Sequence, residues 1–238
     1  FIADNRERPF FLSFTSVVPH THITPAARFR GKSQAGLYGD YIQELDEHVG
    51  RILATLDRLQ LAGRTLVIFS SDNGGAPSDF KGTQNVKLNL ASEAGSVREK
   101  ARSAKRDARA LGHITNGPWH DGKGTPFEGG HRVPFIARWP GQIPPATVSD
   151  ETVCLTDLLA TVAGILEVKL PRDAGEDSFN ILPALCGGPL KEPIRKLTGL
   201  QGDTRDDALA VRSGPWKLIE SKAPKGGKRH QLYDLARD

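Results

Sequence analysis

Three short polar clusters adjoin apolar runs that are typical of strands. They are His20-Thr21-His22, Asp72-Asn73-Gly74-Gly75, and residues 122–134, which begin with Gly122-Lys123-Gly124-Thr125 and lead into the next predicted strand. In open α/β sheets, ligands bind beyond the carboxyl ends of the strands. We therefore expect these clusters to contribute to a common site, provided that the predicted strands form one sheet.

Asp72 and Asn73 place a carboxylate and an amide oxygen side by side, and the following glycines allow the backbone to turn sharply. Hard oxygen donors of this kind suit Ca²⁺ or Mg²⁺ better than zinc. The same residue types also form ordinary Asx turns after strands. Taken alone, this cluster leaves a metal site and a simple turn both open.

The histidines and the lysine are also ambiguous when each is taken alone. His20 and His22 alternate, so an extended segment would direct them to opposite sides and at most one would face a site. Lys123 is flanked by glycines that leave its surroundings unobstructed, so its ammonium could approach an anion. Each of these residues could equally be a solvated loop residue.

The elements that would position these clusters follow from the apolar spacing. Residues 9–15 and 65–70 read as buried strands, and the segment between them has the three- and four-residue periodicity of a helix, with Gly63 as its expected stop. A strand, a helix and a strand form a βαβ unit, which predicts an α/β fold with a parallel sheet. The expected apolar face of the helix is Tyr38, Tyr41, Ile42, Leu45, Val49, Ile52, Leu53, Leu56 and Leu59.

The rest of the chain divides into further predicted elements. A charged insertion spans about residues 79–121, and residues 97–109 within it have good helix propensity but almost no apolar stripe, which favours a surface helix. We expect a strand at 133–139. We also expect a second amphipathic helix at 152–166. Its inward-facing residues would be Val153, Leu155, Leu158, Leu159, Val162 and Ile165.

The proline-rich stretch from Pro189 to Pro193 predicts a boundary between a domain at 1–190 and a smaller one at 191–238. Three short antiparallel strands are expected in the smaller part, and they lie at 208–212, 216–219 and 231–233.

Composition narrows the class of protein. The net charge of +4 suits an anionic substrate, and a lysine-rich solvated surface would explain it equally well. The charged insertion lacks aromatic partners for bases, so we expect no nucleic acid as a partner. No run reaches the roughly 20 apolar residues of a membrane span. Cys154 and Cys186 lie in apolar stretches and are expected to be free thiols. The sequence contains no Met, which indicates a truncated chain.

In their order along the chain, these clusters resemble the sulfatase family of the alkaline-phosphatase-like superfamily. The segments that carry the resemblance are Asp72-Asn73-Gly74, Gly122-Lys123-Gly124-Thr125 and Phe127-Glu128-Gly129-Gly130-His131-Arg132-Val133-Pro134. Residues 211–219 and 232–235 are similar to the small C-terminal antiparallel sheet of that family. The resemblance implies that residues 1–190 are the C-terminal part of a catalytic α/β domain with a mainly parallel sheet flanked by helices, incomplete here, and that 191–238 begin the small subdomain.

The resemblance also implies a role for each candidate residue. Asp72 and Asn73 would be two ligands of a Ca²⁺ ion, and Lys123 would contact the sulfate group and offset charge on the bridging oxygen. His22, rather than His20, would contact the sulfate and protonate the leaving alcohol, because the family histidine stands second in His-x-His. Trp119, His120 and His131 are further candidates for the pocket wall.

The nucleophile of the family is a formylglycine made from the first residue of Cys/Ser-x-Pro-x-Arg. Neither cysteine is followed by that pattern, and Ser213-Gly214-Pro215-Trp216-Lys217 ends in lysine within a predicted strand. We therefore expect the nucleophile and the remaining metal ligands in a missing N-terminal half. The substrate implied is an aryl sulfate or a sulfated carbohydrate, and the location implied is periplasmic or secreted.

Two other functions stay open. A two-zinc phosphoesterase of the same superfamily would place His after the strand-end Asp, where this chain has Asn73, and zinc favours imidazole over an amide oxygen. A catalytically inactive homologue that binds sulfated glycans would lack the modified Cys or Ser upstream.

Overall fold

The computed structural model describes residues 1–20, 22–76, 97–203 and 208–237. The chain forms two compact units. Unit 1 comprises residues 1–65 and 75–118, and unit 2 comprises residues 66–74 and 119–238. Among the described residues, no helix is long and apolar enough to cross a membrane.

The main element of unit 1 is α1 (Gly36–Arg58), which confirms the predicted amphipathic helix. It ends at Arg58, five residues before the predicted stop at Gly63. Gln60 adopts the left-handed conformation with φ of 55°, and the Leu61 N–H donates to the Leu56 carbonyl at 2.8 Å, which completes the C-terminal cap. Gly63 lies instead in the short 3-10 helix η3 (Ala62–Arg64).

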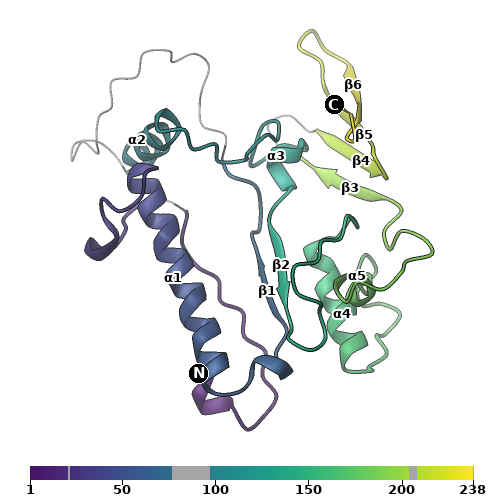
Figure 1. Ribbon diagram of the computed structural model, residues 1–238. Helices are drawn as coiled ribbons and strands as arrows, with labels where there is room; N and C mark the ends of the chain where they lie inside the picture. Colours follow the sequence, from purple (N-terminus) through teal and green to yellow (C-terminus); the bar gives the residue numbers. More distant parts are fainter. Residues whose placement is uncertain (21, 77–96, 204–207, 238) are drawn as a thin grey trace. The chain divides into compact units, whose positions relative to one another are not determined.

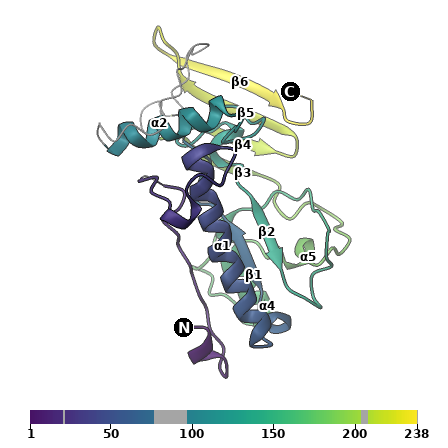
Figure 2. The same ribbon diagram turned by 60° about the vertical axis from the view of Figure 1, so that its left-hand side comes forward.

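The second helix of unit 1, α2 (Val97–Ala110), lies across the N-terminal end of α1 (Figures 1 and 2). Its helical prediction is confirmed, but its prediction as a surface helix without a buried face is wrong. Ala104 and Ala108 are 3% and 0% exposed and pack in one core with Tyr38 and Tyr41 of α1. Small side chains are enough for this contact because they allow two helices to approach closely. The first part of the predicted insertion, residues 79–96, lies outside the described residues.

The predicted strand at residues 9–15 is wrong. These residues have no strand conformation, and Phe11 and Phe14 are 80% and 54% exposed. A strand requires a neighbour for its ladder and cover for its apolar side chains, and the described part of unit 1 contains no strand at all. Two short 3-10 helices, η1 (Ala3–Asn5) and η2 (Ala27–Phe29), complete this unit.

Unit 2 contains both sheets. β1 (Val67–Ser70) pairs with β2 (Phe135–Arg138) in an antiparallel register that sets Ser70 opposite Phe135. These strands confirm the predicted positions at 65–70 and 133–139. The predicted parallel pairing is not found, because every strand pair within the described residues is antiparallel. The expected βαβ unit fails for lack of its first strand.

The second sheet has the order β3-β4-β5-β6 and confirms the predicted small antiparallel sheet (Figure 2, yellow-green to yellow). Its strands are β3 (Thr198–Gln201), β4 (Leu209–Ser213), β5 (Trp216–Lys222) and β6 (Lys228–Asp234). The first of them was not predicted, because a four-residue edge strand containing Gly199 has little strand signal.

The predicted helix at 152–166 is shorter than expected and buries a different face. A 3-10 turn, η4 (Leu155–Asp157), leads into α4 (Leu158–Ile165), and α5 (Leu182–Leu185) follows. Leu155, Leu159 and Val162, which were predicted to face inward, are 40%, 50% and 36% exposed. The fully buried side chains are instead Asp157 and Thr161.

Buried polar groups are retained here because each has hydrogen-bond partners. Asp157 accepts from the backbone N–H groups of Cys154 at 2.7 Å and Phe179 at 3.0 Å, and it pairs with Arg195. The Thr161 hydroxyl donates to the Asp157 carbonyl at 2.7 Å and accepts from the Ile181 N–H at 3.1 Å. Apolar periodicity could not reveal this buried polar face.

Candidate active site

The turn after β1 presents the predicted metal ligands. The Ser71 hydroxyl donates to the Asn73 carbonyl at 3.0 Å, and the Asn73 side-chain nitrogen donates to the Gly74 carbonyl at 2.9 Å. These bonds fix Asn73 through its nitrogen and make the amide oxygen the atom that could bind a cation. Asp72 is exposed, so its carboxylate is open to solvent.

This turn packs directly on the one-turn helix α3 (Glu128–His131). The Gly74 N–H donates to the Gly130 carbonyl at 2.9 Å. A Cβ atom at Gly74 would lie 1.8 Å from the Gly129 carbonyl oxygen, a distance that real side chains do not adopt. The glycine after Asp72-Asn73 is therefore required by close backbone packing.

α3 also packs on the segment that carries Lys123. The Gly129 N–H donates to the His120 carbonyl at 2.8 Å, and a Cβ atom at Gly130 would lie 2.1 Å from the Thr125 carbonyl oxygen. The two glycines in the middle of α3 thus let this helix contact both the turn after β1 and the segment around Lys123.

Lys123 lies at the tip of its own turn. The Thr125 backbone N–H and side-chain hydroxyl both donate to the Gly122 carbonyl, at 3.1 Å and 2.8 Å. Gly124 has a φ of 89°, a conformation that glycine adopts without strain. Lys123 itself is exposed, so its ammonium is displayed to solvent on a backbone held by hydrogen bonds.

Glu128 and His131 of α3 form a cluster with Lys217 that the sequence did not predict. The ammonium of Lys217, from β5, lies 2.9 Å from Glu128 Oε1 and 2.6 Å from His131 Nε2. Burial raises the pKa of Glu128, but the hydrogen bond and charge of Lys217, together with the charge of Arg212, outweigh it and leave the pKa below its usual value. Glu128 and His131 stood within the quoted segment at 127–134, but no sequence signal links them to Lys217.

The aromatic residues named as pocket candidates make other contacts. The Arg132 guanidinium stacks over the Trp119 ring at 3.8 Å from its centroid, and the His120 ring meets Phe127 edge-on at 4.6 Å. Burial lowers the pKa of His131, and the Lys217 ammonium lowers it further. His131 therefore takes part in the cluster with Glu128 and Lys217, and its place in a pocket wall stays a prediction.

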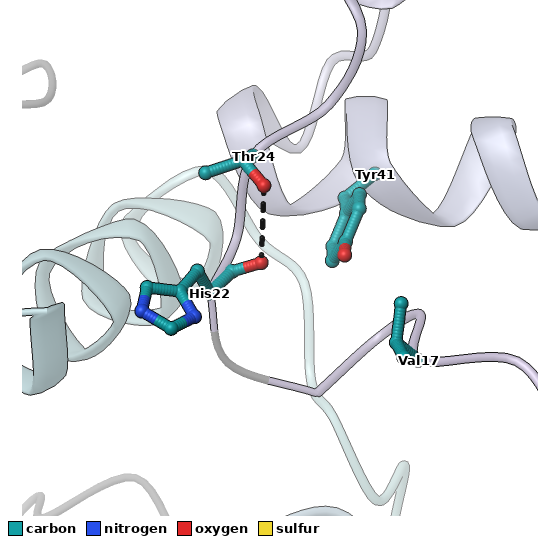
Figure 3. Close-up of a pocket in the computed structure, with 4 residues that line it drawn as sticks. All are labelled: Val17, His22, Thr24 and Tyr41. Carbon is teal, nitrogen blue, oxygen red and sulfur yellow. Dashed lines mark hydrogen bonds between the residues drawn. The ribbon is translucent and has the colours of Figure 1, made fainter.

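His22 lies in unit 1 and lines a hollow of about 350 Å³ with Val17, Thr24 and Tyr41 (Figure 3). The Thr24 hydroxyl donates to the His22 carbonyl at 3.4 Å. The carbonyl faces Tyr41 and the imidazole points away from it, so the exposed ring is available for other partners (Figure 3). Burial and the Glu44 carboxylate raise the pKa of Tyr41, which stays a neutral phenol.

The structure thus groups three of the four predicted site residues. Asp72, Asn73 and Lys123 belong to unit 2, where they stand on turns that contact the same helix, and His22 belongs to unit 1. His20 is exposed in the same loop as His22.

The turn after β1 has oxygen donors of the kind that bind Ca²⁺, but it supplies few of the ligands that the ion needs. Asp72 and Asn73 offer two hard oxygens, whereas Ca²⁺ takes six to eight. Across the described parts of the chain, no three His, Cys, Asp or Glu side chains gather in a way that could hold a metal. Further ligands would have to come from outside the His, Cys, Asp and Glu side chains of the described ranges, or from water.

The described nucleophile candidates do not resemble activated groups. Cys154 and Cys186 are half-buried free thiols, and burial raises the pKa of Cys154, which disfavours the thiolate. Ser213 ends β4 opposite Trp216 within the antiparallel ladder, as predicted for a residue outside the site.

The whole chain was also compared with known proteins. The profile of the family described as Sulfatase matches residues 1–168. The chain is 35% identical to an N-acetylgalactosamine-6-O-sulfatase of Bacteroides thetaiotaomicron over 100% of this chain and 44% of that protein. It is 35% identical to N-acetylgalactosamine-6-sulfatase of Canis lupus familiaris, covering 89% of this chain and 34% of the relative. The chain therefore spans less than half the length of these relatives.

Solved structures share the fold. A Bacteroides thetaiotaomicron structure from work on the metabolism of multiple glycosaminoglycans aligns with a TM-score of 0.81 at 34% identity, over 100% of this chain and 46% of that one. A sulfatase from Pseudoalteromonas sp. aligns with a TM-score of 0.73 at 24% identity, over 99% of this chain and 44% of that one. With the family profile covering well over half of its residues, and the α/β arrangement shared with sulfatase structures, this chain belongs to the sulfatase family.

Proposed function

We propose that the whole protein hydrolyses sulfate esters of a carbohydrate. The observation that carries the proposal is the joint contact of the Asp72-Asn73 turn and the Lys123 turn with α3, which holds an oxygen-rich turn and an exposed ammonium on one backbone framework. The relatives named N-acetylgalactosamine-6-sulfatases support a sulfated amino sugar as the substrate class.

The chemistry of the reaction explains why these residue types are needed. Cleavage of a sulfate ester places negative charge on the nonbridging oxygens and on the departing oxygen. Groups fixed where charge develops stabilise the transition state more than the ground state. In this proposal the Lys123 ammonium meets that charge, and protonated His22 donates its proton to the departing alkoxide.

The proposal includes two components from outside the described residues. Asp72 and Asn73 would contribute two oxygens to a Ca²⁺ site, and when bound the ion would neutralise charge on the sulfate oxygens. The nucleophile would be a formylglycine upstream of residue 1, in a catalytic domain whose sheet is mainly parallel. A periplasmic or secreted location stays a prediction.

The test compares three substrates with the whole protein: an N-acetylgalactosamine 6-sulfate, nitrophenyl sulfate and nitrophenyl phosphate. We expect hydrolysis of both sulfates, loss of activity on chelation and recovery on adding back Ca²⁺. Asp72→Ala should not recover with Ca²⁺, and its Ca²⁺ affinity measured by calorimetry should be lost, while Asn73→Ala should weaken both.

Other outcomes would identify another function. Preference for the phosphate together with two bound zinc ions would indicate a phosphoesterase. Tight binding of the sulfated sugar without any turnover, in a protein that lacks the modified Cys or Ser, would indicate a glycan-binding homologue.

A further inference from the structure

The small C-terminal sheet reaches the candidate site through one buried lysine. Lys217 is the second residue of β5 and is 1% exposed, which is rare for lysine. Its Nζ lies 2.9 Å from Glu128 Oε1 and 2.6 Å from His131 Nε2. Both partners belong to α3, where they occupy the first and last positions. The contact thus joins β5 to both ends of that helix.

The charges in this cluster make Lys217 hard to replace. The Lys217 ammonium donates to the Glu128 carboxylate. Its Nζ also lies 2.6 Å from His131 Nε2, an atom that is 3.1 Å from the Pro126 carbonyl oxygen as well. Burial lowers the pKa of His131 and the adjacent ammonium lowers it further, whereas Glu128 and the hydrogen bond with the Pro126 carbonyl raise it. Glu128 Oε2 is buried and has no hydrogen-bond partner within the described residues, so the carboxylate depends on Lys217 for compensation. Arg132 Nη1 lies farther away, at 3.5 Å.

The backbone of α3, which Lys217 holds through Glu128, contacts both turns of the candidate site. The Gly130 carbonyl accepts from the Gly74 N–H at 2.9 Å on one side. On the other side, a Cβ atom at Gly130 would meet the Thr125 carbonyl oxygen at 2.1 Å, so the helix fits closely against the Lys123 turn. With so little space, α3 cannot shift without moving both turns.

A second contact joins the same sheet to the same turn. The Asp203 N–H, just after β3 (Thr198–Gln201), donates to the Gly124 carbonyl at 2.7 Å. Gly202 also lies close, since a Cβ atom there would be 3.3 Å from that carbonyl oxygen. The residue next to Lys123 is therefore held by the small sheet directly, as well as through α3.

We propose that Lys217 is a positioning residue, which acts through Glu128 and α3 to hold the Lys123 turn and the Asp72-Asn73 turn in their working geometry. The inference rests on the proposed sulfate ester hydrolysis. It assigns to the C-terminal sheet a part in aligning the site, which Lys217 performs through α3.

The kinetic test uses the whole protein with Lys217→Met, and Lys225→Met as the matched control. Lys225 is an exposed lysine in the β5–β6 turn of the same sheet. We expect Lys217→Met to lower kcat about 100-fold, the effect of a misplacement near 1 Å. KM should change little, because the charge that Lys123 offsets develops mainly in the transition state.

A rescue variant separates positioning from general damage. Lys217→Met combined with Glu128→Gln removes both buried charges, so no carboxylate is left uncompensated, and kcat should recover by about tenfold over Lys217→Met alone. Glu128→Gln alone is the milder variant if Lys217→Met folds poorly, and it should lower kcat in the same direction. A lower melting temperature with unchanged kcat in these variants would reduce Lys217 to a structural role and overturn the proposal.

Hydrogen exchange tests the same inference without using activity. Lys217→Met should speed exchange in peptides covering residues 70–76 and 120–131, which contain the Gly74 and Gly129 N–H groups, and Lys225→Met should not. A wild-type protein without sulfate ester hydrolysis would refute the proposed function, and the exchange result would still decide whether Lys217 holds the two turns. Wild-type exchange in Lys217→Met would overturn the positioning role.

Discussion

At the residue scale, the proposed site residues have exposed side chains, and the backbone beside them is fixed by hydrogen bonds. Asp72, Lys123 and His22 are all exposed, whereas the backbone next to each makes specific hydrogen bonds. Identity and spacing alone could not distinguish these residues from solvated loop residues. Two predictions belong to this scale.

The first prediction concerns His22 as the general acid. In the whole protein, His22→Ala should lower kcat about 10²–10⁴-fold for a sugar sulfate. The loss should be much smaller for nitrophenyl sulfate, whose leaving group departs without protonation. His20→Ala, two positions away in the same exposed loop, is the control. Equal losses on the two substrates would contradict the role of His22.

The second prediction concerns Lys123. Lys123→Arg should fail to restore activity, because a planar guanidinium does not reproduce a compact ammonium at a close contact with sulfate. We expect kcat/KM of Lys123→Arg to stay near that of Lys123→Ala. Steady-state kinetics of both variants decide the point, and wild-type values for Lys123→Arg would make Lys123 a surface lysine.

At the element scale, the site depends on how closely short segments approach one another. α3 is only one turn long, and its two central glycines allow contact with the turn after β1 and with the Lys123 segment. This close packing predicts that adding a methyl group at the contact should disturb the site.

Gly74→Ala tests that packing. The new Cβ atom would lie 1.8 Å from the Gly129 carbonyl oxygen and 2.8 Å from its carbon, so backbone must move. We expect a large loss of kcat and weaker Ca²⁺ binding by calorimetry. Gly50→Ala in α1 is the control, since its added Cβ would have no atom within 4 Å apart from its chain neighbours and the nearby backbone of its own helix, and it should be stabilising by about 0.5–1 kcal/mol. Full activity in Gly74→Ala would show that the turn is free to move.

The buried polar face of α4 gives a prediction about stability. Asp157 is 0% exposed, accepts two backbone N–H groups and pairs with Arg195. Asp157→Ala removes one member of a buried ion pair, and we expect the free energy of unfolding to fall by about 3–5 kcal/mol. Urea denaturation of the whole protein measures it. Asp173→Ala, an exposed carboxylate nearby in the sequence, should change stability by less than about 0.5 kcal/mol.

At the scale of the whole molecule, the chain covers 44% of one relative and 34% of another. We predict that residues 1–238 alone show no sulfate ester hydrolysis above background. No three His, Cys, Asp or Glu side chains in the described ranges could hold a metal, and neither cysteine begins the Cys-x-Pro-x-Arg pattern. The assay uses nitrophenyl sulfate with the chain expressed alone and with the formylglycine-generating enzyme. Calcium-dependent turnover by this chain would mean that it contains the nucleophile.

The sequence by itself determined those features that depend on local periodicity and on residue type. The three- and four-residue spacing of apolar side chains located α1, and alternating or continuous apolar runs located β1, β2 and three strands of the small sheet. The glycine-flanked clusters around Asp72 and Lys123 identified the candidate site and the family. These signals are local because each comes from one segment and its own hydrogen-bonding pattern.

The tertiary structure decided everything that depends on partners distant in the sequence. Residues 9–15 read as a strand, yet they form none here, because a strand needs a neighbour that periodicity cannot supply. The burial of Ala104 and Ala108 in α2, and that of Asp157, could not be predicted for the same reason. The pairing of Lys217 with Glu128 joins residues 89 positions apart. Such a contact arises only when the small sheet packs on α3, because a lysine becomes buried only where a specific carboxylate meets it.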